Sequence, residues 1–261
     1  MESNKWDESA AVYRSNVENI SFYKVTNQRI VTAANIQPGM TVIDLACGSG
    51  VTTRLICEAL RGEGKVFAID SSASMLVQAR RYVNSGMVSF LESDACVFSY
   101  QVTEKVDLIL CNAAFWHFSD PPSVLEECRK VLKPKGRVFF NLPDQEFDFG
   151  DGKQSQMSQT VAKCLNQPLR PNMERFDRDI INEIAEKSNF EVSDYKTFGV
   201  DLDYNDLIAF YSIPHVSERR FPELPYNERV KIIESAFSKL DKNTLITYRW
   251  AQFCLKLMND S

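Results

Sequence analysis

The sequence lacks the features of exported and membrane-spanning proteins. No stretch of its 261 residues approaches the roughly 20 consecutive apolar residues that a helix needs to cross a bilayer. Residues 1–7 (MESNKWD) contain no basic segment followed by an apolar one, as a signal or transit peptide would. We therefore expect a cytoplasmic protein that does not bind a membrane.

Paired cysteines are also absent. The seven cysteines are scattered and odd in number, and no two of them are separated by only two residues. This pattern fits neither a disulfide framework nor a zinc site. No compact carboxylate cluster suggests another metal. We predict free, mostly buried thiols and no metal.

The chain has no excess of positive charge. Its 30 lysines and arginines face 35 aspartates and glutamates, which gives a net charge of −5. That balance disfavours a large phosphate-binding surface and therefore a nucleic-acid partner. The nearest basic cluster, between Arg129 and Arg137, lies at a predicted helix end, where solvated positive charge is favourable. We expect a small-molecule substrate and a monomer or homodimer.

Short apolar runs alternate with helical patterns along much of the chain. The runs cover 41–46, 65–69, 88–91, 106–111, 137–142, 190–198 and 245–257, and the helical patterns between them cover 52–60, 74–83, 122–132 and 176–188. Strands that are apolar on both faces and separated by helices predict a parallel sheet covered on both sides. We predict an α/β, doubly wound, Rossmann-like fold with a seven-stranded, mostly parallel sheet, an antiparallel last strand and a helical lid.

The segments outside the alternating pattern predict the lid. Residues 1–35 repeat apolar side chains at helical steps, 201–242 are mostly helical, and 144–175 are polar and irregular. The predicted division is 1–35 as an N-terminal lid segment, 36–143 as the cofactor-binding core, 144–175 as a lid insertion, 176–200 as a core helix and strand, 201–242 as a helical cap and 243–261 as the closing strand.

A glycine turn follows the first predicted strand directly, in residues 42–50 (VIDLACGSG). Gly48 and Gly50 let the backbone turn tightly and approach a ligand closely, and free N–H groups at the following helix start attract its polar parts. Asp70 ends the next strand, 20 residues after Gly50, where a carboxylate can accept bonds from both hydroxyls of a ribose. Both features lie where α/β sheets bind ligands, and they predict a nucleoside cofactor.

These motifs resemble those of class I S-adenosylmethionine-dependent methyltransferases. Residues 44–50 (DLACGSG) look like the first motif of that family, with Ala46 in place of the first glycine of its fullest form. Residues 93–95, 107–121 and 131–136 resemble its later motifs in order and spacing. The resemblance covers about residues 6–143 and is closest to the ubiquinone/menaquinone-type and natural-product subgroup.

The resemblance implies S-adenosyl-L-methionine as cofactor and S-adenosyl-L-homocysteine as its product. It places Asp44 at the amino group of the methionine portion, Gly48 and Gly50 along that portion, Asp70 at the ribose and Asp94 at the adenine amino group. The other residues predicted to contact the cofactor are Tyr13, Ala46, Ser71, Met75, Ala95 and Asn112. Asp44 and Asp94 could instead cap a helix or turn, and Met75 could be plain core.

The two histidines are the catalytic candidates. His117 follows the fourth strand, beside the expected methyl donor, and could act as a base or orient the acceptor. The alternative is that His117 bonds the backbone of a buried loop. His215 is the second candidate, with a solvated loop residue as its alternative. Aromatic side chains suit a partly apolar pocket, so we predict that the substrate contacts Tyr23, Trp116, Phe147 and Tyr211. The alternative is that the aromatic residues of the lid only pack the lid against the sheet.

We predict methyl transfer to a small, partly apolar molecule in the biosynthesis of a natural product or cofactor, with an O, N or C acceptor. One alternative is a fold member that binds the cofactor without methyl transfer, such as a cyclase-like enzyme or an assembly factor. The other is an NAD-dependent oxidoreductase. Thr53 disfavours that alternative because it stands where the dinucleotide fingerprint has its third glycine.

Overall fold

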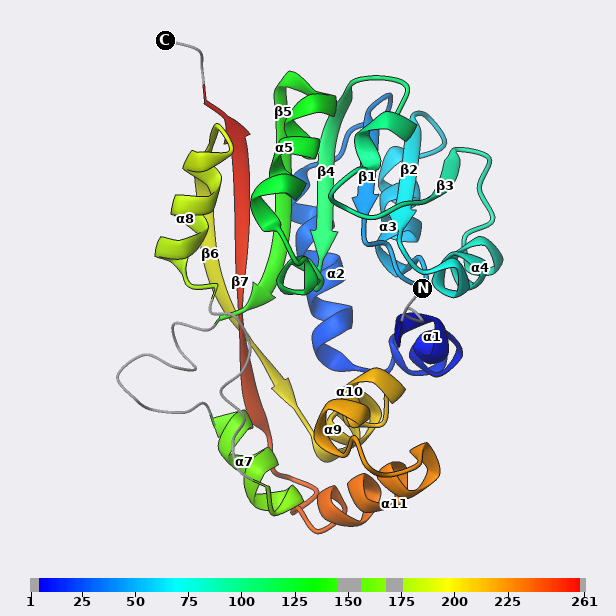
Figure 1. Ribbon diagram of the computed structural model, residues 1–261, viewed down its shortest axis with the longest axis vertical. Helices are drawn as coiled ribbons and strands as arrows, with labels where there is room; N and C mark the ends of the chain where they lie inside the picture. The colour runs from blue at the N-terminus through cyan, green and yellow to red at the C-terminus, as the bar shows by residue number, and fades with distance from the viewer. Residues whose placement is uncertain (1–4, 145–155, 168–175, 259–261) are drawn as a thin grey trace.

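The computed structural model describes residues 5–144, 156–167 and 176–258, built around one seven-stranded sheet (Figure 1). The strands are β1 (Thr41–Leu45), β2 (Lys65–Asp70), β3 (Val88–Glu92), β4 (Val106–Asn112), β5 (Leu132–Pro143), β6 (Phe190–Leu202) and β7 (Ile246–Leu257). Their order in the sheet is β3-β2-β1-β4-β5-β7-β6. β1 to β5 pair in parallel, whereas β7 is antiparallel to both β5 and β6. The predicted sheet, including its antiparallel last strand, is confirmed.

Helices cover both faces of this sheet because its central strands are apolar on both sides. The helices on one face are α2 (Ser21–Ala34), α3 (Val51–Leu60) and α4 (Ala73–Tyr82), and those on the other are α5 (Pro121–Val131) and α8 (Arg178–Lys187). Two short 3₁₀ helices, η1 (Phe98–Gln101) and η2 (Phe115–His117), lie on either side of β4 in the chain. All five residues of β1 are buried, as a central parallel strand requires.

The remaining helices gather beyond the carboxyl ends of the parallel strands (Figure 1). They are α1 (Lys5–Asn16), α7 (Gln156–Leu165), α9 (Tyr204–Tyr211), α10 (Pro214–Arg220) and α11 (Tyr226–Phe237). β6 and β7 extend from the sheet into this group and supply its core with Phe198, Val200 and the fully buried Trp250. None of the helices in the described ranges has the length and apolar character needed to cross a membrane.

Three elements differ from the sequence interpretation. α2 belongs to the segment interpreted as lid, residues 1–35, but Ile30 and Ala34 pack it against the sheet. α7 lies in the segment interpreted as irregular, because Met157, Val161 and Leu165 recur every four residues and are buried in the cap. β5 begins at Leu132 and not at residue 137, where the apolar run begins, since Leu132 already pairs with Val106 before a register shift in β4.

Candidate active site

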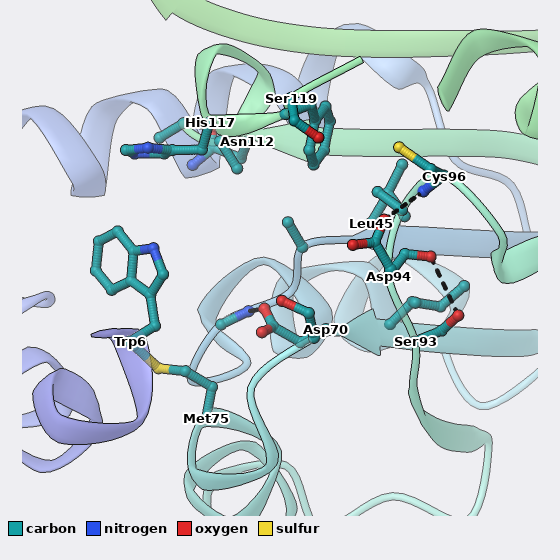
Figure 2. Close-up of a pocket in the computed structure, with 18 of the residues that line it drawn as sticks. Trp6, Leu45, Asp70, Met75, Ser93, Asp94, Cys96, Asn112, His117 and Ser119 are labelled. Carbon is teal, nitrogen blue, oxygen red and sulfur yellow. Dashed lines mark hydrogen bonds between the residues drawn. The ribbon is translucent and has the colours of Figure 1, made fainter. Parts of the chain in front are cut away.

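A cavity opens at the carboxyl ends of β1, β2 and β4, beneath α1 (Figure 2). This is the place where a doubly wound sheet leaves a crevice for a ligand. The cavity is lined by Trp6, Tyr13, Tyr23, Leu45, Ala46, Gly48, Ile69, Asp70, Ser71, Met75, Ser93, Asp94, Ala95, Cys96, Asn112, Ala113, Ala114, His117, Phe118 and Ser119.

The glycine turn forms one edge of the cavity with alternate residues in the left-handed backbone region. Ala46, Gly48 and Gly50 have φ angles of 57°, 52° and 89°. A Cβ atom on Gly48 would approach only Tyr13, at 3.8 Å, whereas one on Gly50 would lie 3.0 Å from Val83. Gly48 therefore leaves space beside the cavity, and Gly50 allows the turn to pack closely against α4.

Asp70, the last residue of β2, is held in place by backbone N–H groups. The Gly48 N–H donates to Oδ2 at 2.8 Å, and the Ser72 N–H donates to Oδ1 at 2.9 Å. Burial raises the pKa of Asp70 above its ordinary value, although these two bonds act in the opposite direction. Each carboxylate oxygen has a further lone pair, so the group can still accept hydrogen bonds from a ligand in the cavity.

Asp44 lies behind the glycine turn and does not line the cavity. Its side chain is fully buried, and Oδ2 accepts a hydrogen bond from the Thr53 hydroxyl at 2.5 Å. Oδ1 is buried without a hydrogen-bond partner among the described residues. Burial raises the pKa of Asp44 to about 7, while the Thr53 hydroxyl acts to lower it. The Oδ1 atom of Asp44 can accept a hydrogen bond from a positively charged donor that approaches the turn.

The residues after β3 and the start of α4 also line the cavity (Figure 2). Asp94 is exposed, and its Oδ1 accepts a hydrogen bond from the Cys96 N–H at 2.7 Å. The carboxylate thus caps a turn, as the alternative interpretation held, and also lines the cavity. Met75 is buried near the start of α4 and provides an apolar surface on the same cavity.

Asn112, the last residue of β4, belongs to a network of side-chain amides. Its Nδ2 donates to Asn27 Oδ1 at 3.0 Å, and its Oδ1 accepts from Asn141 Nδ2 at 2.9 Å. Asn27 and Asn141 in turn donate to the backbone carbonyls of Tyr23 and Thr26. Because a carbonyl can only accept, these two bonds fix the orientation of all three amides. The network joins α2 to β4 and β5 directly below the cavity.

The two histidines come together from distant parts of the chain at the cap side of the cavity. The centroid of the His117 ring lies 5.6 Å from that of Trp6 and 6.3 Å from that of His215. The His117 side chain is exposed to the open cavity. Desolvation by the neighbouring residues, followed by the charges of His215 and Arg219, lowers its pKa to about 4. Burial also lowers the pKa of His215. Both imidazoles are therefore neutral near pH 7 and can accept a proton.

This arrangement predicts that His117 does not titrate in the physiological range. The chain contains only two histidines, so their C2 protons can be followed by NMR without overlap. We expect no change in the His117 chemical shift between pH 8 and pH 6 in the wild type, because an imidazole with a pKa of about 4 stays neutral over that range. The His215→Gln variant assigns the remaining signal to His117. A midpoint near 6.5 for that signal would contradict the lowered pKa.

The structure brings most of the predicted site residues to one cavity. Those that line it are Tyr13, Tyr23, Ala46, Gly48, Asp70, Ser71, Met75, Asp94, Ala95, Asn112 and His117. Asp44 lies behind the turn, and Gly50 is part of the turn but faces α4. His215 contacts Trp6 from α10. Trp116 and Tyr211 pack in the cap core instead of lining the cavity. Phe147 lies outside the described residues.

Several lining residues were not among the sequence predictions. Leu45, Ile69, Ser93, Cys96, Ala113, Ala114, Phe118 and Ser119 are neighbours in the chain of predicted site residues. The rule that strand ends and the loops after them form the site could have included them. Trp6 has no such local signal, because only the docking of α1 brings it to the cavity.

A family model described as "Methyltransferase domain" matches residues 36–196, which is more than half of the chain. The chain belongs to the class I S-adenosylmethionine-dependent methyltransferase family. The match contains the glycine turn, Asp70, Asp94 and the loop after β4. It does not include α1, α2 or most of the cap, where the lining residues Trp6, Tyr13 and Tyr23 and the neighbouring His215 lie.

Curated relatives and solved structures extend this assignment. A ubiquinone biosynthesis O-methyltransferase of Pasteurella multocida is 31% identical over 124 residues, covering 43% of this chain and 50% of that protein. The chain thus spans about half the length of this curated relative. A structure titled as a complex between the Haloferax volcanii Trm112 methyltransferase activator and the putative methyltransferase aligns over all of both chains, with a TM-score of 0.64 and 18% identity.

A methyltransferase of Thiobacillus denitrificans solved with S-adenosylhomocysteine has a TM-score of 0.55 and 20% identity, covering 89% of this chain and 91% of that one. At such identities the two structural similarities concern the fold.

The cavity fits the cofactor of this methyltransferase family, S-adenosylmethionine, in its charge. Asp70 and Asp94 are the carboxylates among the described lining residues, and no lysine or arginine is found among them. His117 is neutral, so the cavity is suited to a ligand with a positive sulfonium and amino group. The partnerless Oδ1 of Asp44 lies just behind the same turn. In the described ranges no group of three or more histidine, cysteine or acidic side chains is arranged to hold a metal ion.

Proposed function

We propose that the protein transfers the methyl group of S-adenosylmethionine to a small, partly apolar molecule in a biosynthetic pathway. The observation that carries the proposal is the position of His117. Its neutral ring faces the cavity that also holds Asp70, with the indole of Trp6 opposite (Figure 2). The same cavity thus offers a nucleoside-binding carboxylate and a proton acceptor beside aromatic surface.

We assign the cofactor-binding roles by position around the cavity. Asp70 would bind the ribose hydroxyls with the lone pairs left free by Gly48 and Ser72. The residues after β3, with Asp94, would hold the adenine, and Met75 would pack against it. Asp44 would receive the amino group of the methionine portion, which offsets the unfavourable burial of its carboxylate.

Bound S-adenosylmethionine supplies an electrophilic methyl group, so the protein must chiefly align a nucleophile and exclude water. His117 would orient the O–H or N–H of the acceptor and take its proton on a ring nitrogen. A pKa of about 4 makes the imidazole a weak base, which suits a proton that becomes acidic only as the methyl group is transferred. The name of the Pasteurella relative, ubiquinone biosynthesis O-methyltransferase, supports an oxygen acceptor.

Calorimetric titration with S-adenosylmethionine, S-adenosylhomocysteine and NAD tests the cofactor part of the proposal. We expect micromolar binding of the two sulfur ligands and none of NAD. Asp70→Ala should weaken the binding of both sulfur ligands at least about 100-fold, because two charge-assisted hydrogen bonds to the ribose are lost. NAD binding to folded wild-type protein would instead support an oxidoreductase.

A radiolabelled methyl donor with a panel of phenols, amines and activated-methylene compounds tests the transfer. We expect labelled product from a phenol or amine, and a His117→Ala variant that binds S-adenosylhomocysteine normally but transfers methyl groups at least about 100-fold more slowly. Cofactor binding with no transfer to any of these classes would favour the alternative of a cofactor-binding protein without methyl transfer.

A further inference from the structure

Helix α1 is fastened to the cofactor side of the cavity by one acidic side chain, Asp7. Asp7 Oδ1 accepts hydrogen bonds from the Ser72 hydroxyl at 2.6 Å and from the Ser74 N–H at 3.0 Å. The Ser72 bond is the main cause that lowers the pKa of Asp7 below its ordinary value. Ser72 is the N-cap of α4, so the carboxylate of Asp7 also lies at the positive end of that helix.

The same serine holds the ribose-binding carboxylate. The Ser72 hydroxyl donates to Asp7 and accepts from the Met75 N–H at 3.1 Å, while its backbone N–H donates to Asp70 Oδ1 at 2.9 Å. Ser72 is fully buried, and Asp7 is half-buried. One buried residue therefore connects α1, the start of α4 and the acid at the end of β2.

The position of α1 also determines the side chains that cover the cavity. Trp6 precedes Asp7 and lines the cavity, and Tyr13 lies two turns further along the same helix beside Gly48. On its other side, α1 reaches the cap, where the Ser9 hydroxyl accepts a hydrogen bond from the backbone N–H of His215 at 3.0 Å. Fixing the first turn of α1 thus fixes one wall of the cavity.

We propose that Asp7 is a positioning residue for the cofactor: acting through Ser72, it holds the carboxylate of Asp70 in its binding orientation and keeps α1 over the cavity. The inference rests on the cofactor site of the proposed function. Asp7 itself does not line the cavity, so its effect on binding passes through Ser72 and α1. A simple helix cap would stabilise the fold without changing the affinity for the cofactor product.

Calorimetric titration with S-adenosylhomocysteine separates the two roles. Asp7→Ala should weaken binding about five- to tenfold, the range expected for one lost charge-assisted bond in a pre-organised site. Asp7→Asn should retain part of the affinity, because its amide oxygen can still accept from Ser72. Glu8→Gln, an exposed carboxylate removed from the next position of the same helix, should stay within about twofold of wild type.

A double-mutant cycle shows whether the effect passes through Asp70. In an Asp70→Asn background, titrated at higher ligand concentration, Asp7→Ala should weaken binding clearly less than it does in the wild type, because the part of the effect that passes through the Asp70 carboxylate is gone and only the part that passes through α1 remains. Hydrogen exchange of residues 5–16 should slow on ligand binding in the wild type and much less in Asp7→Ala. Urea unfolding of each variant confirms that it is folded.

Two results would overturn the proposal. One is an Asp7→Ala affinity within twofold of wild type in folded protein. The other is the same loss in both backgrounds, which would mean that Asp7 acts independently of Asp70. Both readouts use the binding of the product and not methyl transfer, so the absence of an acceptor for the proposed reaction leaves them intact.

Discussion

Asp44→Asn is expected to remove the stability loss that the Asp44 carboxyl causes in the ligand-free protein between pH 5 and pH 8. Burial raises the pKa of the Asp44 carboxyl from 3.8 to about 7, so the folded protein keeps a proton that the unfolded chain has released. The contribution of this proton to the free energy of unfolding is fully present below pH 3.8. It decreases as the pH rises and is lost once the pH has passed through about 7. Asparagine resembles the protonated acid and does not titrate.

The size of this effect follows from the difference between the two pKa values. A shift of about three units corresponds to at most about 4 kcal/mol at pH 8. Urea unfolding at pH 5, 6, 7 and 8 measures it, with Glu63→Gln as a control in which an exposed carboxylate is removed. The difference in free energy of unfolding between wild type and Asp44→Asn should change by about 3 kcal/mol between pH 5 and pH 8, because about two of the three pH units that separate the pKa values lie above pH 5. Parallel curves would show that Asp44 is ionised in the folded protein at all these pH values.

Gly50→Ala should destabilise the protein by about 3 kcal/mol. Gly50 has a φ of 89°, where a side chain adds roughly 1–2 kcal/mol of backbone strain. Its Cβ atom would also lie 3.2 Å from Ala79 and 3.0 Å from Val83. Both neighbours are short side chains, so relief requires α4 to move, and such overpacking costs roughly 1–3 kcal/mol.

Gly48→Ala is the matched control, two residues away in the same turn. Its φ of 52° also lies in the left-handed region, but the nearest atom to the added Cβ is Tyr13 Cε1 at 3.8 Å. The expected destabilisation is therefore the backbone strain alone, about 1 kcal/mol. Urea unfolding of both variants measures the difference. Equal destabilisation would mean that contact with α4 does not constrain the turn.

The cofactor half of the site was predictable because its signals are local in the sequence. Each of its acids follows a strand that is recognisable as an apolar run, and parallel strands bring their carboxyl ends to one edge. Asp70 and Asp94 therefore had to lie near the glycine turn once the strands were assigned. The order and spacing of the motifs also predicted the family.

Side-chain direction limits how far this local reasoning reaches. Asp44 belongs to the same motif, yet its side chain points behind the turn to Thr53 instead of into the cavity. Trp116 is adjacent to His117, but it packs against Trp250 in the cap core, with ring centroids 5.8 Å apart. The left-handed Ala113 and the 3₁₀ helix η2 decide which of these neighbours faces the ligand, and neither leaves a pattern in the sequence.

The sequence by itself determined the sheet, the family and the acids around the cofactor, because these depend on hydrophobic periodicity and on glycine at turn positions. Only the tertiary structure decided what covers the cavity. Trp6 and Asp7 reach it because α1 docks on α4, and His215 meets His117 because α10 packs against α1. Contacts between residues 65 to 206 positions apart depend on how whole helices pack, and no short segment of the chain specifies that packing.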